Sequence, residues 1–319
     1  MSTTTSVLGG VVRRREDPAL IQGTGLYTDD LKLNGMLHAA FVRSPYAHAR
    51  ITSIDSSEAL TVDGVHAIYT IDDVRHLGPL LAQVAVGKAR PLLADGTVNH
   101  AGEAVAMVIA EDRYIAQDAA DAVFVEYDTL DPIVDLKLAA TDDVLVHDDL
   151  ESNTLISWVG GPFGDEDAIA ETRQTIQAAK DRDDTFTVSI EMRNQKLIPS
   201  AIEPRSVVAD WNRGYQRFDV HSSTQIPHAL AGAIAKTFGI ASNSVRAVAP
   251  EVGGGFGAKL NVYNDEILVC FGSQKLGPPV KYTETRREAA VSTIQGRGWV
   301  GTATVTGTTD GEILGYELE

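Results

Sequence analysis

The residues best placed to do chemistry lie in a glycine cluster, Glu251 to Lys259, with the sequence EVGGGFGAK. Glycines at four of five positions, 253 to 255 and 257, allow positive φ angles and bring bare backbone close to a bulky group. Successive backbone N–H groups in such a loop can form a concavity that binds anions. The cluster therefore predicts either a loop around a phosphate, an oxyanion or a cofactor edge, or a tight glycine turn between sheet elements.

A second candidate is Gln225, in the segment STQIPH that ends at His228. A glutamine at the end of a strand and near the start of a helix can donate its amide N–H to an oxo or phosphate group. Alone, such a glutamine is more typical of a solvated loop, and His228 of a helix start. Because Gln225 and the loop from Gly254 to Gly257 each follow a predicted strand, we expect them to lie close together.

Other chemistry finds less support in the residues. Gly253, Gly255 and Ala258 fit the G-x-G-x-x-A spacing of a dinucleotide-binding loop. That fold requires a helix at once and an acidic residue at a strand end ~20 residues later, whereas residues 256–264 begin poorly as a helix. A NAD-dependent dehydrogenase is therefore a weaker alternative. No zinc-ligand spacing and no G-x-S-x-G motif occur, so we assign no direct metal ligand.

Composition limits the partners and the compartment. The net charge of −17 argues against nucleic acid as the main partner, because a phosphate backbone requires a basic face. The single cysteine, Cys270, lies in an apolar stretch and is expected to be buried, and one thiol cannot hold an iron–sulfur cluster. No stretch reaches the ~18 apolar residues of a membrane span, and the N-terminus lacks a signal-peptide pattern. The sequence therefore predicts a cytoplasmic protein.

Two regions are expected to position these residues. Residues 12–138 mix strands at 35–42, 105–110 and 123–127 with a helix at 113–124, which favours an α+β domain. A turn-rich, acidic stretch from about 141 to 164 separates this domain from a second one, residues 152–319. The second is expected to hold helices at 165–180 and 229–238 and strands at 185–192, 207–211, 218–222, 245–249, 299–306 and 313–318. The last two strands begin a sheet that looks interrupted, with an unpaired edge.

Several segments in order resemble one family. In the second region these are Ser223–Gln225 with Pro227-His228, Val245-Arg246, and the cluster from Gly253 to Lys259. Glu203-Pro204-Arg205 and residues 280–284 agree. In the first region they are residues 15–30, FVRSPYAHA at 41–49 and GEAVA at 102–106. Over nearly all 319 residues the chain resembles the large subunit of molybdenum hydroxylases, the family of xanthine dehydrogenase, aldehyde oxidase and carbon monoxide dehydrogenase.

The resemblance implies a fold and an activity. The fold is an α/β-hammerhead domain over residues 12–138, followed by the first part of a molybdopterin-binding domain over 152–319. The activity is hydroxylation of an aldehyde, an N-heterocycle or a related small molecule, with water as the oxygen source. The cofactor is molybdenum-molybdopterin in the cytosine dinucleotide form of bacterial members. Electrons pass to iron–sulfur and FAD partner subunits, as the single cysteine also requires.

The resemblance also implies roles for individual residues. Gln225 matches a glutamine that contacts an oxygen ligand of molybdenum. The loop of Gly254, Gly255, Phe256 and Gly257 matches one that lies over the metal, with Phe256 beside the active site. Leu260 stands where the purine-oxidising members carry a carboxylate, which argues against xanthine as the substrate. The loop is closer to the branch of carbon monoxide dehydrogenase.

One departure from the family concerns length. The family subunit is much longer, and its catalytic glutamate base is expected beyond Glu319, so no catalytic residue is assigned in this chain. A further chain that supplies the remaining cofactor domain is an expected partner, and the isolated chain is expected to be inactive. A truncated or split chain that acts only as a binding or assembly module remains an alternative.

Overall fold

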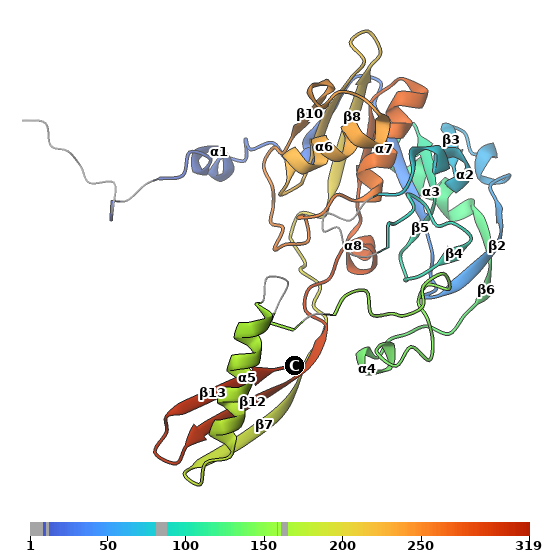
Figure 1. Ribbon diagram of the computed structural model, residues 1–319. Helices are drawn as coiled ribbons and strands as arrows, with labels where there is room; N and C mark the ends of the chain where they lie inside the picture. The colour runs from blue at the N-terminus through green and yellow to red at the C-terminus, as the bar shows by residue number, and fades with distance from the viewer. Residues whose placement is uncertain (1–8, 11–12, 81–87, 158, 161–164) are drawn as a thin grey trace, which may run out of the picture.

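A seven-stranded mixed sheet forms the centre of the molecule (Figure 1). The computed structural model describes residues 9–10, 13–80, 88–157, 159–160 and 165–319. In spatial order the strands of the central sheet are β10 (Val245–Val248), β9 (Arg217–Ser222), β8 (Ser206–Asn212), β11 (Val280–Thr283), β1 (Leu37–Arg43), β5 (Ala104–Ala110) and β3 (Val65–Tyr69).

Two smaller sheets and eight α-helices complete the described fold. The first small sheet orders β4 (Thr97–Val98), β2 (Ala49–Asp55) and β6 (Phe124–Thr129), and the second orders β13 (Ile313–Leu318), β12 (Trp299–Thr308) and β7 (Thr185–Asn194). The helices are α1 (Asp17–Ile21), α2 (Ile71–Val74), α3 (Arg113–Ala122), α4 (Leu136–Ala139), α5 (Glu166–Lys180), α6 (Pro227–Phe238), α7 (Asn264–Leu276) and α8 (Arg286–Ser292). None of the helices in these described ranges is long and apolar enough to cross a membrane.

The central sheet crosses the division predicted between residues 138 and 152. Strand β1, from the first region, pairs in parallel with β11, from the second, through Leu37 opposite Val280 and His38 opposite Lys281. The pairing satisfies backbone N–H and C=O groups that would otherwise stay open on both strands. No strand lies within the described part of residues 141–160, and the boundary between two domains there stays a prediction. The predicted start at Val12 lies outside the described residues.

The core is built on both faces of β5, whose residues from Val105 to Ala110 are fully buried. Helix α7 covers one face and is buried almost all round, from Ile267 to Phe271. Cys270 lies in this stretch with no exposed surface, as predicted, and burial raises the pKa of its thiol well above the usual value. The alanines of helix α3 pack on the other face of β5. The cluster around α7 contains residues of both regions, such as Met107 and Val207, so it holds the two regions together.

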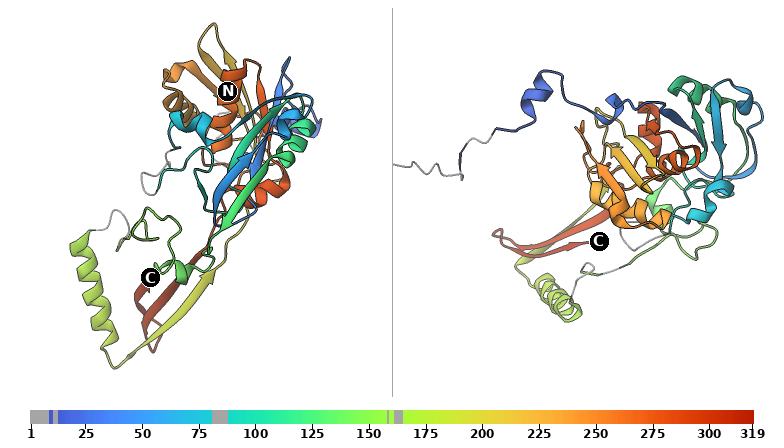
Figure 2. Two further views of the ribbon diagram at one scale, coloured as in Figure 1. Left: turned by 90° about the vertical axis from the view of Figure 1, so that its right-hand side faces the viewer. Right: turned by 90° about the horizontal axis from the view of Figure 1, so that it is seen from above.

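The three-stranded sheet β13-β12-β7 and helix α5 project from the body formed by the central sheet (Figures 1 and 2). Asp165 caps α5, because its carboxylate accepts from the backbone N–H groups of Asp167 and Ala168. Ile176 of α5 packs on Gly315, which shares a sheet face with threonines of β12 and β7. The helix therefore covers the more polar face of this sheet.

The opposite face of the same sheet is apolar and open. The alternation of apolar and polar residues over 185–192 is typical of a half-buried strand and predicts burial of the apolar side, but Phe186, Val188 and Ile190 of β7 are 49%, 57% and 60% exposed. Tyr316 and Leu318 of β13 share this face and are 58% and 60% exposed. We call these five residues the apolar sheet face. The prediction of burial was wrong because α5 packs on the other side, so alternation in the sequence identified an apolar face that nothing in the described chain covers.

Candidate functional site

The site forms where two neighbouring strands end. Strands β9 and β10 are parallel neighbours, with Val248 opposite His221, so their carboxyl ends meet at one edge of the sheet. Gln225 follows the end of β9, and the glycine loop follows the end of β10. The backbone N–H of Gly257 donates to Gln225 Oε1 at 3.2 Å. The predicted proximity of Gln225 and the loop is therefore confirmed.

Gln225 is held at both its backbone and its side chain. Its backbone N–H donates to the carbonyl oxygen of Lys259 at 3.0 Å, and its Oε1 accepts from Gly257. Because a backbone N–H can donate only to an acceptor, this contact fixes which side-chain atom is the oxygen. The Nε2 amide makes no hydrogen bond within the described part of the chain. Its two hydrogens are therefore free to reach an oxygen of a ligand.

The loop adopts a conformation that gathers its amides. Gly254, Phe256 and Gly257 have φ angles of +95°, +50° and +90°, while Gly255 between them is not in this region. Neighbouring residues of opposite φ sign, such as Gly254 and Gly255, can turn their N–H groups toward one point, as in an anion-binding nest. Among the described residues, the N–H groups of Gly254, Gly255 and Phe256 have no hydrogen-bond partner. A Cβ at position 255 would lie 2.3 Å from Gln225 Oε1, so any larger residue there would displace the Gln225 side chain from its present position.

Phe256 and Leu260 give this edge an apolar rim. Phe256 holds a positive φ that is rare for a residue with a side chain, yet its ring is 76% exposed. Strain of this kind persists where the surroundings impose it and is concentrated at functional sites. Leu260 is 46% exposed. The arrangement places unpaired hydrogen-bond donors beside apolar surface, so it suits an oxygen-rich group such as an oxo or phosphate.

The dinucleotide alternative loses its structural basis here. Helix α7 begins at Asn264, after the turn that follows the loop, so it does not start directly from the glycines as a dinucleotide-binding helix would. Strands β10 and β11 flank α7 in sequence but are separated in the sheet by β9 and β8. Across the described residues, no group of three or more His, Cys, Asp or Glu side chains could hold a metal ion.

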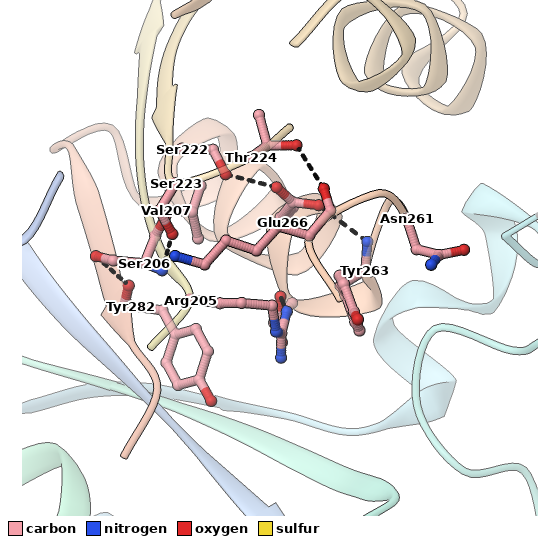
Figure 3. A pocket seen from close by; sticks show the side chains of 12 residues that line it. Arg205, Ser206, Val207, Ser222, Ser223, Thr224, Asn261, Tyr263, Glu266 and Tyr282 are labelled. Carbon is pink, nitrogen blue, oxygen red and sulfur yellow. Dashed lines mark hydrogen bonds and ion pairs between the residues drawn. The ribbon is translucent and has the colours of Figure 1, made fainter. Parts of the chain in front are cut away.

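A buried ionic network lies beside the site, and Figure 3 shows two of its members, Arg205 and Tyr263. The guanidinium of Arg205 donates to both carboxylate oxygens of Asp265 at 2.7 Å and to Glu284 at 2.8 Å. It also stacks over the ring of Tyr263, 3.6 Å from the ring centre. Although burial lowers the pKa of Arg205, its two carboxylate neighbours hold it well above the usual value. The network joins the starts of β8 and α7 to the end of β11.

Glu266, shown in Figure 3, is a further buried carboxyl next to this network. It accepts from the hydroxyl of Ser222 at 2.6 Å and from the backbone N–H of Tyr263 at 2.9 Å. Burial raises the pKa of Glu266 to about 7. These bonds link the end of β9, three residues before Gln225, to the start of α7.

Comparison with known proteins decides the family. Residues 22–131 match the a/b hammerhead domain of aldehyde oxidase and xanthine dehydrogenase. Residues 161–319 match the molybdopterin cofactor-binding domain. The chain belongs to the molybdenum hydroxylase large-subunit family.

Individual relatives agree over nearly the whole chain. The carbon monoxide dehydrogenase large chain of Hydrogenophaga pseudoflava is 35% identical over 308 residues, which cover 95% of this chain and 38% of that one. The nicotine 6-hydroxylase large subunit of Paenarthrobacter nicotinovorans is 32% identical over 290 residues, covering 89% and 34%. The structure of reconstituted CO dehydrogenase from Oligotropha carboxidovorans matches with a TM-score of 0.86 and 31% identity, covering 97% and 39%. The chain thus spans less than two fifths of these relatives.

The structure places the predicted site residues together where β9 and β10 end. It also places two further residues, Lys259 and Glu203, next to them. Lys259 and Glu203 were noticed only as parts of family-like motifs, with no role assigned. Their side chains form an ion pair, Nζ to Oε2, at 2.8 Å, with only 2% and 12% of each exposed. The available signal was a lysine placed directly after the glycine cluster, but its burial depends on the fold.

Proposed function

We propose that this chain supplies one wall of the molybdopterin site of a bacterial-type molybdenum hydroxylase. The contact between Gln225 Oε1 and the N–H of Gly257 carries the proposal, because it leaves the Gln225 Nε2 amide and the loop N–H groups free on one side. These donors would hold oxygen ligands of the cofactor, which we take to be the cytosine dinucleotide form. When bound, the cofactor supplies a two-electron oxidation of a carbon centre with oxygen from water, and iron–sulfur and FAD partners take the electrons.

The apolar rim supports a small, uncharged substrate. Phe256 and Leu260 present exposed apolar surface beside the donors, with no carboxylate at position 260 to pair with a polar purine. A carbon monoxide dehydrogenase and a nicotine hydroxylase are similar to this chain at 35% and 32% identity, so the relatives do not select one substrate. We therefore propose aldehydes, N-heterocycles or related small molecules, with Leu260 facing the substrate.

We further propose that turnover requires additional cofactor-domain polypeptide. A pterin dinucleotide is large and anionic, and tight binding needs enclosure from several sides. The donors of this chain lie on one open edge, and the net charge of −17 works against an anionic ligand. The open apolar sheet face, and the 38% of a relative that the chain spans, support a further polypeptide that packs here and provides the proton acceptor.

A non-catalytic binding or assembly module is the second candidate, and the apolar sheet face favours it as well. The two functions differ at Gln225. A module that binds only through the sheet face does not need a free amide at the loop, whereas a cofactor wall does. Replacement of Gln225 should therefore be silent for the module and disabling for the cofactor site.

The test measures bound molybdenum and turnover. The chain would be purified alone and together with the part of the Hydrogenophaga pseudoflava large chain that lies outside the matched region. Molybdenum would be measured by mass spectrometry, and activity by dye-linked oxidation of aldehydes and N-heterocycles. We expect molybdenum only in the complemented sample, and less of it with Gln225→Ala than with the control Gln117→Ala on α3. Stoichiometric molybdenum with turnover in the chain alone would refute the need for further polypeptide, and no molybdenum in either sample would refute the cofactor.

A further inference from the structure

A buried ion pair lies directly behind the glycine loop. Lys259 Nζ lies 2.8 Å from Glu203 Oε2, and only 2% of the lysine side chain is exposed. Glu203 comes from the segment before β8, far from the loop in sequence. Neither residue offers a free charged group to solvent, so the pair acts through the segments that it joins.

The pair connects three segments that meet at the site. The Glu203 carboxylate accepts from the backbone N–H of Gly253 at 2.8 Å, and its own N–H donates to the Gly253 carbonyl at 3.2 Å. A Cβ at Gly253 would lie 2.5 Å from that of Glu203, which shows how closely the backbones approach. At the other end of the loop, the Lys259 carbonyl accepts from Gln225 N–H. The ion pair therefore joins both ends of the loop to each other through Glu203, and the Lys259 backbone holds the backbone of Gln225.

The energetics of the pair argue against a role in stability alone. Burial lowers the pKa of Lys259, although Glu203 raises it, which shows that the protein imposes a desolvation cost. Glu203 Oε1 is buried and has no hydrogen-bond partner in the described part of the chain. An incompletely satisfied buried ion pair is often no more stable than an apolar pair of the same size. The fixed geometry of the ion pair can, however, favour one position of the loop over others.

We propose that Glu203 and Lys259 are positioning residues that hold the glycine loop and Gln225 at the spacing needed to receive an oxygen-bearing cofactor. The identity of the ligand in this inference rests on the proposed function. The effect of the ion pair on the position of the loop does not depend on that function. In this view the pair sets the distance between the loop donors and the Gln225 amide, and the rest of the fold does not depend on it.

The first experiment measures the loop without any cofactor. The variant Glu203→Gln/Lys259→Met removes both charges at nearly constant volume. In the full chain we expect a melting temperature within about 4 °C of wild type, while amide hydrogen exchange of residues 250–260 becomes about tenfold faster. The control Lys137→Met/Glu191→Gln removes an exposed pair, 62% and 59% exposed, and should leave the loop unchanged. Loop exchange within about twofold of wild type, or faster exchange spread equally over all segments, would overturn the proposal.

A second pair of variants covers the case in which the double variant does not fold. Glu203→Gln keeps an acceptor for Gly253 N–H, whereas Glu203→Ala removes it. We expect faster loop exchange in both variants, because both lose the charge of Glu203, and the larger effect in Glu203→Ala, which also loses the bond to Gly253 N–H. Loop exchange at the wild-type rate in both folded variants would contradict a positioning role.

The last measurement separates this inference from the proposed function. Molybdenum is measured in the complemented sample for wild type and for Glu203→Gln/Lys259→Met. If wild type binds molybdenum and the folded variant binds about tenfold less, the inference stands. If both bind it equally, the inference is overturned and the function survives. If wild type binds none, the proposed function fails, and the hydrogen-exchange result alone decides the role of the pair.

Discussion

Glu266 should make the stability of the protein fall as the pH rises. Its carboxyl is fully buried, and its pKa is raised from 4.5 to about 7. The folded state therefore binds a proton between these pH values that the unfolded state has released. The stabilisation is fully present below pH 4.5 and is lost as the pH rises through about 7.

The magnitude follows from the size of the shift. A shift from 4.5 to about 7 corresponds to about 3 kcal/mol in the free energy of unfolding, at 1.36 kcal/mol per pKa unit. The variant Glu266→Gln removes this titration but keeps the local bonding pattern. Its oxygen can accept from Tyr263 N–H, and its amide can donate to the Ser222 hydroxyl. The variant should match wild type near pH 4.5 and exceed its stability by up to about 3 kcal/mol at pH 8.

Urea unfolding at several pH values between 4.5 and 8 measures this difference. The control Glu171→Gln alters an exposed carboxyl on α5 and should show no such trend. A difference between Glu266→Gln and wild type that stays flat over this range would refute the reasoning, because the buried carboxyl would then have the same pKa in both states.

Three further predictions concern the loop, the buried network and the open sheet. Gly255→Ala places a Cβ 2.3 Å from Gln225 Oε1, so it should cost about 1–3 kcal/mol and speed loop hydrogen exchange; unchanged exchange would contradict the close approach. Arg205→Met removes the nearest cation from two buried carboxylates and leaves Asp265 only the more distant Arg43, so it should cost about 3–5 kcal/mol, measured by urea unfolding; a loss below about 1 kcal/mol would show that the network is hydrated. Val188→Ser/Ile190→Ser should lower concentration-dependent association measured by light scattering, since it makes the apolar sheet face more polar. Association equal to that of wild type would show that another surface mediates it.

Local patterns predicted most of the elements correctly. The continuous apolar run in β5, the Asp165 cap of α5 and the glycine that ends α6 were each readable, because they depend on residues close together in sequence. The parallel pairing of β1 with β11 was not readable. It joins segments about two hundred and forty residues apart, and no local pattern encodes which strands become neighbours.

The sequence by itself determined the chemistry available at the site. The glycine spacing and Gln225 after a strand predicted either a donor-lined loop or a tight glycine turn, because φ freedom and side-chain donors are properties of the residues themselves. Only the tertiary structure decided how these donors are held. The parallel alignment of β9 with β10 brings Gln225 to Gly257. Folding also buries Glu203 and Lys259 as an ion pair, and burial raises the pKa of Glu266. Burial is a property of the packed fold, because it depends on distant segments that exclude water together.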